Sequence, residues 1–134
     1  KAYLENPGLN TEEDKRTSLN ILEKFKLAFQ RRKLQADRIR IEIDKSPYPV
    51  LVCGDFNDVP NSYAYEIIGK HLQNAFVAKG AGLGRTYQSI SPTLRIDHIF
   101  TDKQFSIRQF GRLVNKLSDH YALVTDLQTP SAQP

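Results

Sequence analysis

Apolar side chains recur with a helical period in the first third of the chain. The members of this stripe are Leu22, Phe25, Phe29, Ala36, Ile39 and Ile43. Spacings of three, four and seven predict an amphipathic helix that covers one side of a sheet. Thr11 and the acidic residues after it favour its start, and the prolines of 46–49 its end. The period is interrupted at Arg32, and a bend or two successive helices both fit this interruption.

A short apolar run follows, from Pro49 to Cys53, and Gly54 ends it. Short apolar runs between proline and glycine are typical of fully buried strands. Cys53 is the only cysteine, which excludes an intrachain disulfide, and within such a strand we expect it to pack as a small hydrophobe. Asp55 and Asn57 come directly after this strand, where α/β folds usually bind ligands.

The rest of the chain alternates short elements with turns. We expect a short helix over 63–68, a loop over 70–84 and a short strand over 85–88. Three further runs rich in Ile, Phe, Leu and Val predict the strands of one meander. These runs are 94–101, 105–114 and 120–127. The order of elements predicts an α/β (α+β) fold with a mixed or antiparallel sheet.

Length and charge narrow the function only a little. A chain of 134 residues is expected to form one domain. It shows no signal-peptide pattern and no apolar run near the ~20 residues of a membrane span, and the compartment stays open. The net charge is +4, with eleven Lys and Arg against eight acids in residues 1–45 and eight against seven in 46–134. A solvated helix face accounts for this excess without nucleic-acid binding.

Asp55 and Asn57 are the first candidates for chemistry. Two positions apart in extended backbone, their side chains leave the same face. The carboxylate can hold a divalent cation or accept a proton from water, and the amide can donate to a phosphate oxygen. An Asx-rich turn after a strand is the competing interpretation. Asp58, in the same stretch, is assigned only a capping role for the turn at Ser62.

Asp97 interrupts an apolar run, where a carboxylate is costly without a partner. A salt bridge to Arg95 or water at the rim would satisfy it. The functional interpretation is that it orients a catalytic histidine. His98 alternates to the opposite strand face and is expected to pack. The adjacent Asp119 and His120 can supply a metal ligand and an imidazole to one site, although such pairs are also common in loops.

Three blocks in one order carry a family resemblance. They are Gly-Asp-Phe-Asn-Asp at 54–58, Arg-Ile-Asp-His-Ile-Phe at 95–100 and Ser-Asp-His-Tyr-Ala-Leu at 118–123. In this order and spacing they resemble the endonuclease/exonuclease/phosphatase family, the deoxyribonuclease-I-like phosphoesterases. The resemblance runs from about Leu22 to Leu127. It implies a sandwich of two sheets with helices outside, and metal-dependent in-line attack of water on a phosphate ester.

The resemblance also implies a role for each matching residue. Asp55 would align or deprotonate the attacking water, and Asn57 would hold the scissile phosphate and its metal. Asp97 would orient His120, which would contact the phosphate and transfer a proton. Asp119 would join Asp55 and Asn57 among the metal ligands. Hard oxygen ligands of this kind select Mg²⁺ or Mn²⁺.

One departure from the family concerns the beginning of the chain. The family's first half supplies a further Asn, an acidic ligand (usually Glu) and a further His, and nothing before residue 22 resembles them. Residues 1–128 therefore look like the carboxyl-terminal portion of one domain, half of a four-layer sandwich with helices on one sheet face. Residues 129–134 are expected to be a disordered tail. The exposed inner face would pair with the missing half or with a second copy, so we expect self-association and little activity.

Two function classes stay open. The first is a phosphoesterase, and the second is a catalytically silent binding or scaffolding relative that keeps the fold. The retained acidic residues favour the enzyme. Its substrate could be a nucleic acid, a phosphoinositide or a phospholipid head group, and the nearly neutral charge of 46–134 argues against a processive nuclease. Arg85, Arg95 and Lys116 are the nearest cations in sequence and are expected to contact substrate phosphates.

Overall fold

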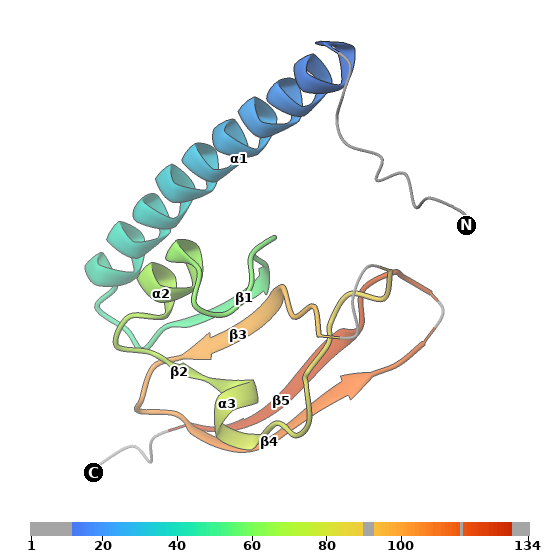
Figure 1. The fold of residues 1–134 in the computed structure, drawn as a ribbon. Helices are drawn as coiled ribbons and strands as arrows, with labels where there is room; N and C mark the ends of the chain where they lie inside the picture. Colours follow the sequence, from blue (N-terminus) through green and yellow to red (C-terminus); the bar gives the residue numbers. More distant parts are fainter. Residues whose placement is uncertain (1–11, 90–92, 116, 130–134) are drawn as a thin grey trace. The chain divides into compact units, whose positions relative to one another are not determined.

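A computed structural model describes residues 12–89, 93–115 and 117–129 (Figure 1). The chain divides into two compact units, residues 1–35 and residues 36–134. Helix α1 (Glu12–Lys45) runs across the boundary between them. The expected Thr11 cap, the expected tail from residue 130 onward and Lys116 lie outside the described residues.

Helix α1 is one uninterrupted element of 34 residues, so the alternative of two successive helices is wrong. In the first unit, Phe25 and Phe29 are exposed. The guanidinium of Arg32 lies 4.7 Å from the centroid of the Phe29 ring. An arginine can cover an aromatic ring with its stem and head, which allows it to interrupt the apolar stripe without ending the helix. Among the described residues, no helix is both long and apolar enough to cross a membrane.

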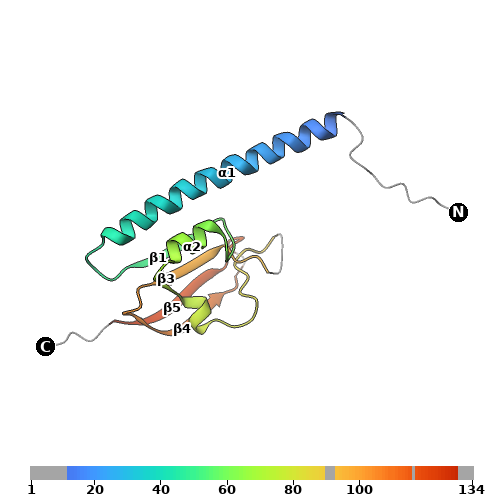
Figure 2. The same ribbon diagram turned by 60° about the vertical axis from the view of Figure 1, so that its left-hand side comes forward.

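The second unit contains two antiparallel sheets (Figures 1 and 2). The strands are β1 (Leu51–Asp55), β2 (Gln73–Asn74), β3 (Asp97–Thr101), β4 (Ser106–Leu113) and β5 (Ala122–Gln128). The first sheet has the order β1-β3-β2, and β4 and β5 form the second. The β1–β3 register pairs Leu51 with Thr101 and Asp55 with Asp97. The predicted α/β class with antiparallel strands is confirmed.

Two details of the predicted topology are wrong. β3 pairs with β1 and β2, whereas β4 pairs with β5, so the last three strands do not form one meander. Both edges of β3 are occupied by strands from earlier in the chain, which leaves no edge for β4. The expected strand over 85–88 contributes only a single bridge, between Tyr87 and His120. The expected loop over 70–84 contains β2 and the short helix α3 (Ala75–Lys79).

Helix α2 (Tyr63–Gly69) and the end of α1 cover one face of the first sheet (Figure 2). The Ser62 hydroxyl accepts a hydrogen bond from the Tyr65 N–H at 3.2 Å and caps α2. Ala36, Ala64 and Ile68 form a buried cluster over Val52. A second cluster joins α3, β3 and the β4–β5 hairpin. Its buried members are Ala75, Ile99 and Ile107, with Phe110, Leu123 and Leu127 against them.

Strand β1 is not fully buried, contrary to the sequence-based expectation. Val52 packs under the helices, whereas Leu51 and Cys53 are exposed. Successive side chains of a strand point to opposite faces, and the helices cover only one of them. The apolar run therefore marks a strand correctly but overestimates its burial.

Candidate functional site

Three segments bring polar side chains together at one end of the β1–β3 pair. The antiparallel register places Asp55, the last residue of β1, opposite Asp97, the first residue of β3. His120, which precedes β5, supplies the third side chain. One ligand atom from each of these three residues lies within 4.8 Å of the other two. The end of one strand and the start of its antiparallel partner thus meet as a single site.

Asp97 and His120 form a close hydrogen-bonded pair, which is an ion pair when the imidazole is protonated. Nδ1 of His120 lies 2.9 Å from Oδ2 and 3.1 Å from Oδ1 of Asp97. A carboxylate only accepts hydrogen bonds, so Nδ1 carries a proton and Nε2 is left for other chemistry. The hydrogen bond from Asp97 raises the pKa of His120, because it stabilises the imidazolium. The two side chains are 16% and 29% exposed, which leaves the pair accessible from solvent.

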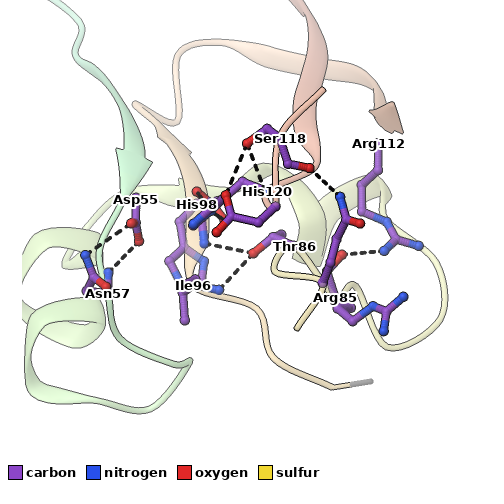
Figure 3. Close-up of polar contacts among 12 residues, drawn as sticks. Asp55, Asn57, Arg85, Thr86, Ile96, His98, Arg112, Ser118 and His120 are labelled. Atoms are coloured by element: carbon purple, nitrogen blue, oxygen red, sulfur yellow. Dashed lines mark hydrogen bonds and ion pairs between the residues drawn. The ribbon is translucent and has the colours of Figure 1, made fainter. Parts of the chain in front are cut away.

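Asp55 and Asn57 meet through a turn and not through an extended strand. The backbone N–H of Asn57 donates to Oδ1 of Asp55 at 2.7 Å, and Nδ2 donates to Oδ2 at 3.1 Å (Figure 3). Asn57 has a φ of 48°, a left-handed conformation that asparagine tolerates better than most residues. The Asx turn weighed as the competing interpretation is therefore present, and it is what sets the amide beside the carboxylate.

Thr86 holds the site together from behind, and sequence reasoning missed it. Its hydroxyl accepts hydrogen bonds from the N–H groups of Ile96 at 3.0 Å and Asp97 at 3.1 Å (Figure 3). Its carbonyl accepts one from the Tyr121 N–H at 2.8 Å. Thr86 is 1% exposed. A single buried threonine therefore connects the start of β3 to the segment that carries His120. No local sequence pattern predicts this role, because its partners are distant in the chain.

Asp119 is not one of the three residues whose ligand atoms lie within 4.8 Å of one another, although its charge, in addition to the hydrogen bond with Asp97, contributes to the raised pKa of His120. Its carboxylate is exposed and lies 3.5 Å from the Ser118 hydroxyl, while its carbonyl accepts a hydrogen bond from the Gln88 N–H. The Ser118 hydroxyl also accepts from the His120 N–H at 3.0 Å (Figure 3). The turn at Ser118 therefore leaves the Asp119 carboxylate exposed, while the His120 ring lies against Asp97. One group of possible metal ligands among the described residues is Asp55, Asp97 and His120. The set of Asp55, Asn57 and Asp119 stays a prediction.

Carboxylates and imidazole are suitable ligands for a divalent cation. Two carboxylates at short range also repel each other, and a bound cation would remove that repulsion. The oxygen ligands of Asp55 and Asp97 suit Mg²⁺ or Mn²⁺, while the imidazole widens the range of metals that fit. The residues present therefore fit a divalent metal.

Arg85 and Arg95, the two described arginines that were expected to contact substrate, lie in different surroundings. Nη2 of Arg85 donates to the Tyr121 hydroxyl at 2.9 Å, next to the segment of His120. Arg95 lies over the Phe76 ring, 4.0 Å from its centroid, and burial lowers the pKa of its guanidinium. Arg95 makes no salt bridge with Asp97 within the described residues, because the carboxylate faces His120. Lys116 lies outside the part of the chain that is described.

His98 packs in the core, as predicted from strand alternation. It is 2% exposed and meets the rings of Phe56 and Tyr65 edge-on. Its Nε2 lies 3.2 Å from the carbonyl oxygen of Asp58, which can only accept, so Nε2 carries the proton. Burial lowers the pKa of His98, although that hydrogen bond opposes the shift. The Asp58 carboxylate accepts from the Val59 N–H, and Ser62 supplies the helix cap.

Comparison with known proteins decides the family. The profile described as the Endonuclease/Exonuclease/phosphatase family matches residues 21–120, which include the described site residues. The chain belongs to this family. Its members are phosphoesterase-type hydrolases, and the Asp-Phe-Asn and Asp-His sequences of the site lie within the matched span. A comparison with curated proteins finds no match.

Solved structures share the fold. An endonuclease/exonuclease/phosphatase family protein from Bacteroides thetaiotaomicron is 21% identical with a TM-score of 0.62, over 78% of this chain and 46% of that one. An endonuclease/exonuclease/phosphatase from Bacteroides vulgatus is 26% identical with a TM-score of 0.60, over 73% of this chain and 44% of that one. A mannosyl-6-phosphatase from Bacteroides thetaiotaomicron is 22% identical with a TM-score of 0.51, over 71% and 43%. The chain thus spans less than half the length of these proteins.

Proposed function

We propose that this chain carries part of the active site of a metal-dependent phosphoesterase, which hydrolyses a phosphate ester by in-line attack of water. The convergence of Asp55, Asp97 and His120 from three distant segments carries this proposal. Bringing two carboxylates together opposes folding unless a cation or a proton compensates them. Membership of a family of phosphoesterase-type hydrolases gives that arrangement a chemical purpose.

Each residue has a role that follows from its contacts. Asp55 can accept a proton from water, and Asn57, held against it, presents an amide to a phosphate oxygen. His120 can give a proton from Nε2 to the substrate while Asp97 holds Nδ1 and stabilises the imidazolium. The raised pKa of His120 favours the protonated form that such donation needs. Asp55 is thus assigned to the attacking water, Asn57 to the phosphate and His120 to the donated proton.

A divalent metal, Mg²⁺ or Mn²⁺, completes the proposed site. Asp55, Asn57 and Asp119 were the expected ligands, and the carboxylate of Asp97, which groups with Asp55 and His120, is a further oxygen ligand, while His120 keeps its proton for transfer. When bound, the metal supplies a positive charge that neutralises the charge developing on the phosphoryl oxygens. We retain nucleic acid, phosphoinositide and phospholipid head groups as substrate classes.

The test is hydrolysis by the full-length protein that carries this chain. It is assayed with Mg²⁺ or Mn²⁺ against DNA, RNA, bis-p-nitrophenyl phosphate and phosphoinositides. Asp55→Ala and His120→Ala should abolish turnover of whichever substrate is cleaved. His71→Ala is the matched control, because His71 is an exposed histidine outside the site. Equal activity in all three variants would disprove the assignment.

A silent binding relative is the competing function. It predicts that the wild-type protein binds phosphate esters but turns over none of them with any divalent metal. Binding that survives His120→Ala without turnover in the wild type would favour that alternative. The ion pair of Asp97 and His120 favours the enzyme, because a binding protein gains little from orienting an imidazole with a carboxylate.

We also propose that the chain by itself self-associates and shows little activity. Leu51, Leu113 and Val124 are exposed apolar residues of the strands. The missing half of the domain or a second copy of the chain would cover them. Light scattering on the isolated chain is expected to show a dimer or larger species. A clean monomer, or strong metal-dependent turnover by the isolated chain, would contradict this proposal.

A further inference from the structure

Two arginines from distant segments meet around one tyrosine ring. The guanidinium carbon of Arg85 lies 5.6 Å from the centroid of the Tyr121 ring, and that of Arg112 lies 5.8 Å from it. Arg85 donates to the Tyr121 hydroxyl, and Nη1 of Arg112 donates to the carbonyl oxygen of Arg85. Arg112 belongs to β4, so the pair exists only because the hairpin reaches the segment before Thr86. The sequence singled out Arg85 as a candidate for substrate contact but did not indicate Arg112 as its neighbour.

The positive charge of this pair is not balanced by the described part of the chain. Arg85 and Arg112 are each half-buried, and their described hydrogen-bond acceptors are a hydroxyl and a carbonyl, both neutral. No carboxylate among the described residues forms a salt bridge with either. Each guanidinium has five N–H donors, of which these contacts use one. Two like charges around one ring repel each other, and an anion bound between them would remove that repulsion.

The pair adjoins the proposed active site through its neighbours in the chain. Arg85 precedes Thr86, which binds the start of β3, and Tyr87, whose ring lies 4.9 Å from that of His120. Tyr121 directly follows His120. Figure 3 shows Asp55 and Asn57 on one side of His120, and Arg85 and Arg112 on the other. The arginine pair and the Asp55–Asn57 turn thus flank the histidine.

We propose that Arg85 and Arg112 bind a second phosphate group of the substrate while the scissile phosphate lies at His120. The substrate class is then a phosphate ester that carries at least one further phosphate. This inference rests on the proposed function for the identity of the scissile group, but anion binding by the pair does not. Guanidinium donors match phosphate oxygens in pairs, which a lysine ammonium does not reproduce.

Binding of inorganic pyrophosphate to the full chain tests the subsite without catalysis. Isothermal titration calorimetry is performed without divalent metal on the wild type, Arg85→Gln, Arg112→Gln and Arg112→Lys. Each Gln variant should weaken pyrophosphate binding roughly tenfold to a hundredfold, as expected for a lost charge-assisted hydrogen bond. The affinity of Arg112→Lys should lie between those of the wild type and Arg112→Gln. Arg108→Gln is the matched control, because Arg108 is an exposed arginine of the same strand. It should leave the affinity unchanged.

Kinetics of the full-length protein give a second readout. A phosphoinositide that carries a further phosphate is compared with one that carries only the scissile phosphate, and Arg112→Gln should raise KM selectively for the first. Loss of pyrophosphate affinity in the arginine variants without turnover of any ester would uphold the subsite and refute the proposed function. Turnover with unchanged pyrophosphate affinity in Arg85→Gln and Arg112→Gln would overturn the subsite alone. An equal loss of pyrophosphate affinity in Arg108→Gln would show that only the net charge of the protein matters, and this would also overturn the subsite. Circular dichroism identifies variants that do not fold. If Arg112→Gln does not fold, the pyrophosphate affinity of Arg112→Lys decides the test instead.

Discussion

The first two residues of strand β3 present side chains of opposite character to the two faces of the strand, whereas Ile99, on the same face as Asp97, is buried in the second cluster. His98 and Phe100 point to the helices, where they are 2% and 3% exposed and contact Phe56 and Tyr65. Asp97, the residue next to His98, points the other way and binds His120. A strand with a period of two can therefore supply a packed core and a polar site from adjacent residues. Substitutions of Asp97 and of the packed residues His98 and Phe100 should therefore affect different properties.

The largest effect is expected at Asp97. Asp97→Asn keeps the shape of the side chain but removes the charge that holds Nδ1 of His120 and stabilises its imidazolium. Turnover should fall roughly 10²–10⁴-fold, the contribution typical of general acid–base catalysis, while the thermal unfolding midpoint changes little. Steady-state kinetics and circular dichroism on the full-length protein measure both. If Asp97→Asn lowered stability but the folded fraction kept its turnover, Asp97 would act in packing and not in catalysis.

On the packed face the expected effect is on stability. Phe100→Ala removes a 3% exposed ring that contacts Phe56, Tyr65 and His98, and should lower the free energy of unfolding by about 3–5 kcal/mol. Urea denaturation measures the loss. The milder Phe100→Leu should cost less and allow kinetics on folded protein, where kcat should be retained. A loss of kcat in Phe100→Leu as large as in Asp97→Asn would erase the distinction between the faces.

Gly69→Ala tests the same face from the helix side. A Cβ on Gly69 would stand 2.6 Å from a carbon of the Phe100 ring, too close for contact without movement. Overpacking of this kind should cost about 1–3 kcal/mol in the free energy of unfolding. Gly111→Ala is the control, because a Cβ there meets nothing within 4 Å. Equal unfolding midpoints of the two variants would show that the ring has room to shift.

The smallest effects concern protonation, and the two histidines should differ in sign. The pKa of His120 is raised, so its stabilising contribution is complete below about 6.5, the unfolded value, and is lost as pH rises through its folded pKa. The pKa of His98 is lowered, so its contribution is present above about 6.5 and is lost as pH falls through its folded pKa. NMR titration of metal-free protein measures both values. Asp97→Asn should lower the pKa of His120 and leave that of His98 nearly unchanged.

Much of the site followed from local sequence. The alternation of Asp97 and His98 predicted one polar and one packed residue, and both lie as expected. The position of Asp55 and Asn57 after a strand indicated a polar strand end. These features depend on residue type and strand period, which neighbouring residues encode. Arg95 shows the limit of such reasoning, because its position near Asp97 in sequence did not make the two partners.

The sequence by itself determined that Asp97 and His98 occupy opposite strand faces, that Asp55 ends a strand and which family the motifs resemble. Only the tertiary structure decided that β3 pairs with β1 and β2, that Thr86 binds the backbone of Asp97, and that Arg112 reaches Arg85. These contacts join segments separated by many residues, and similar apolar strands can pair in several ways. Which pairing forms depends on the sum of packing over the whole second unit, a quantity that no short stretch of sequence contains.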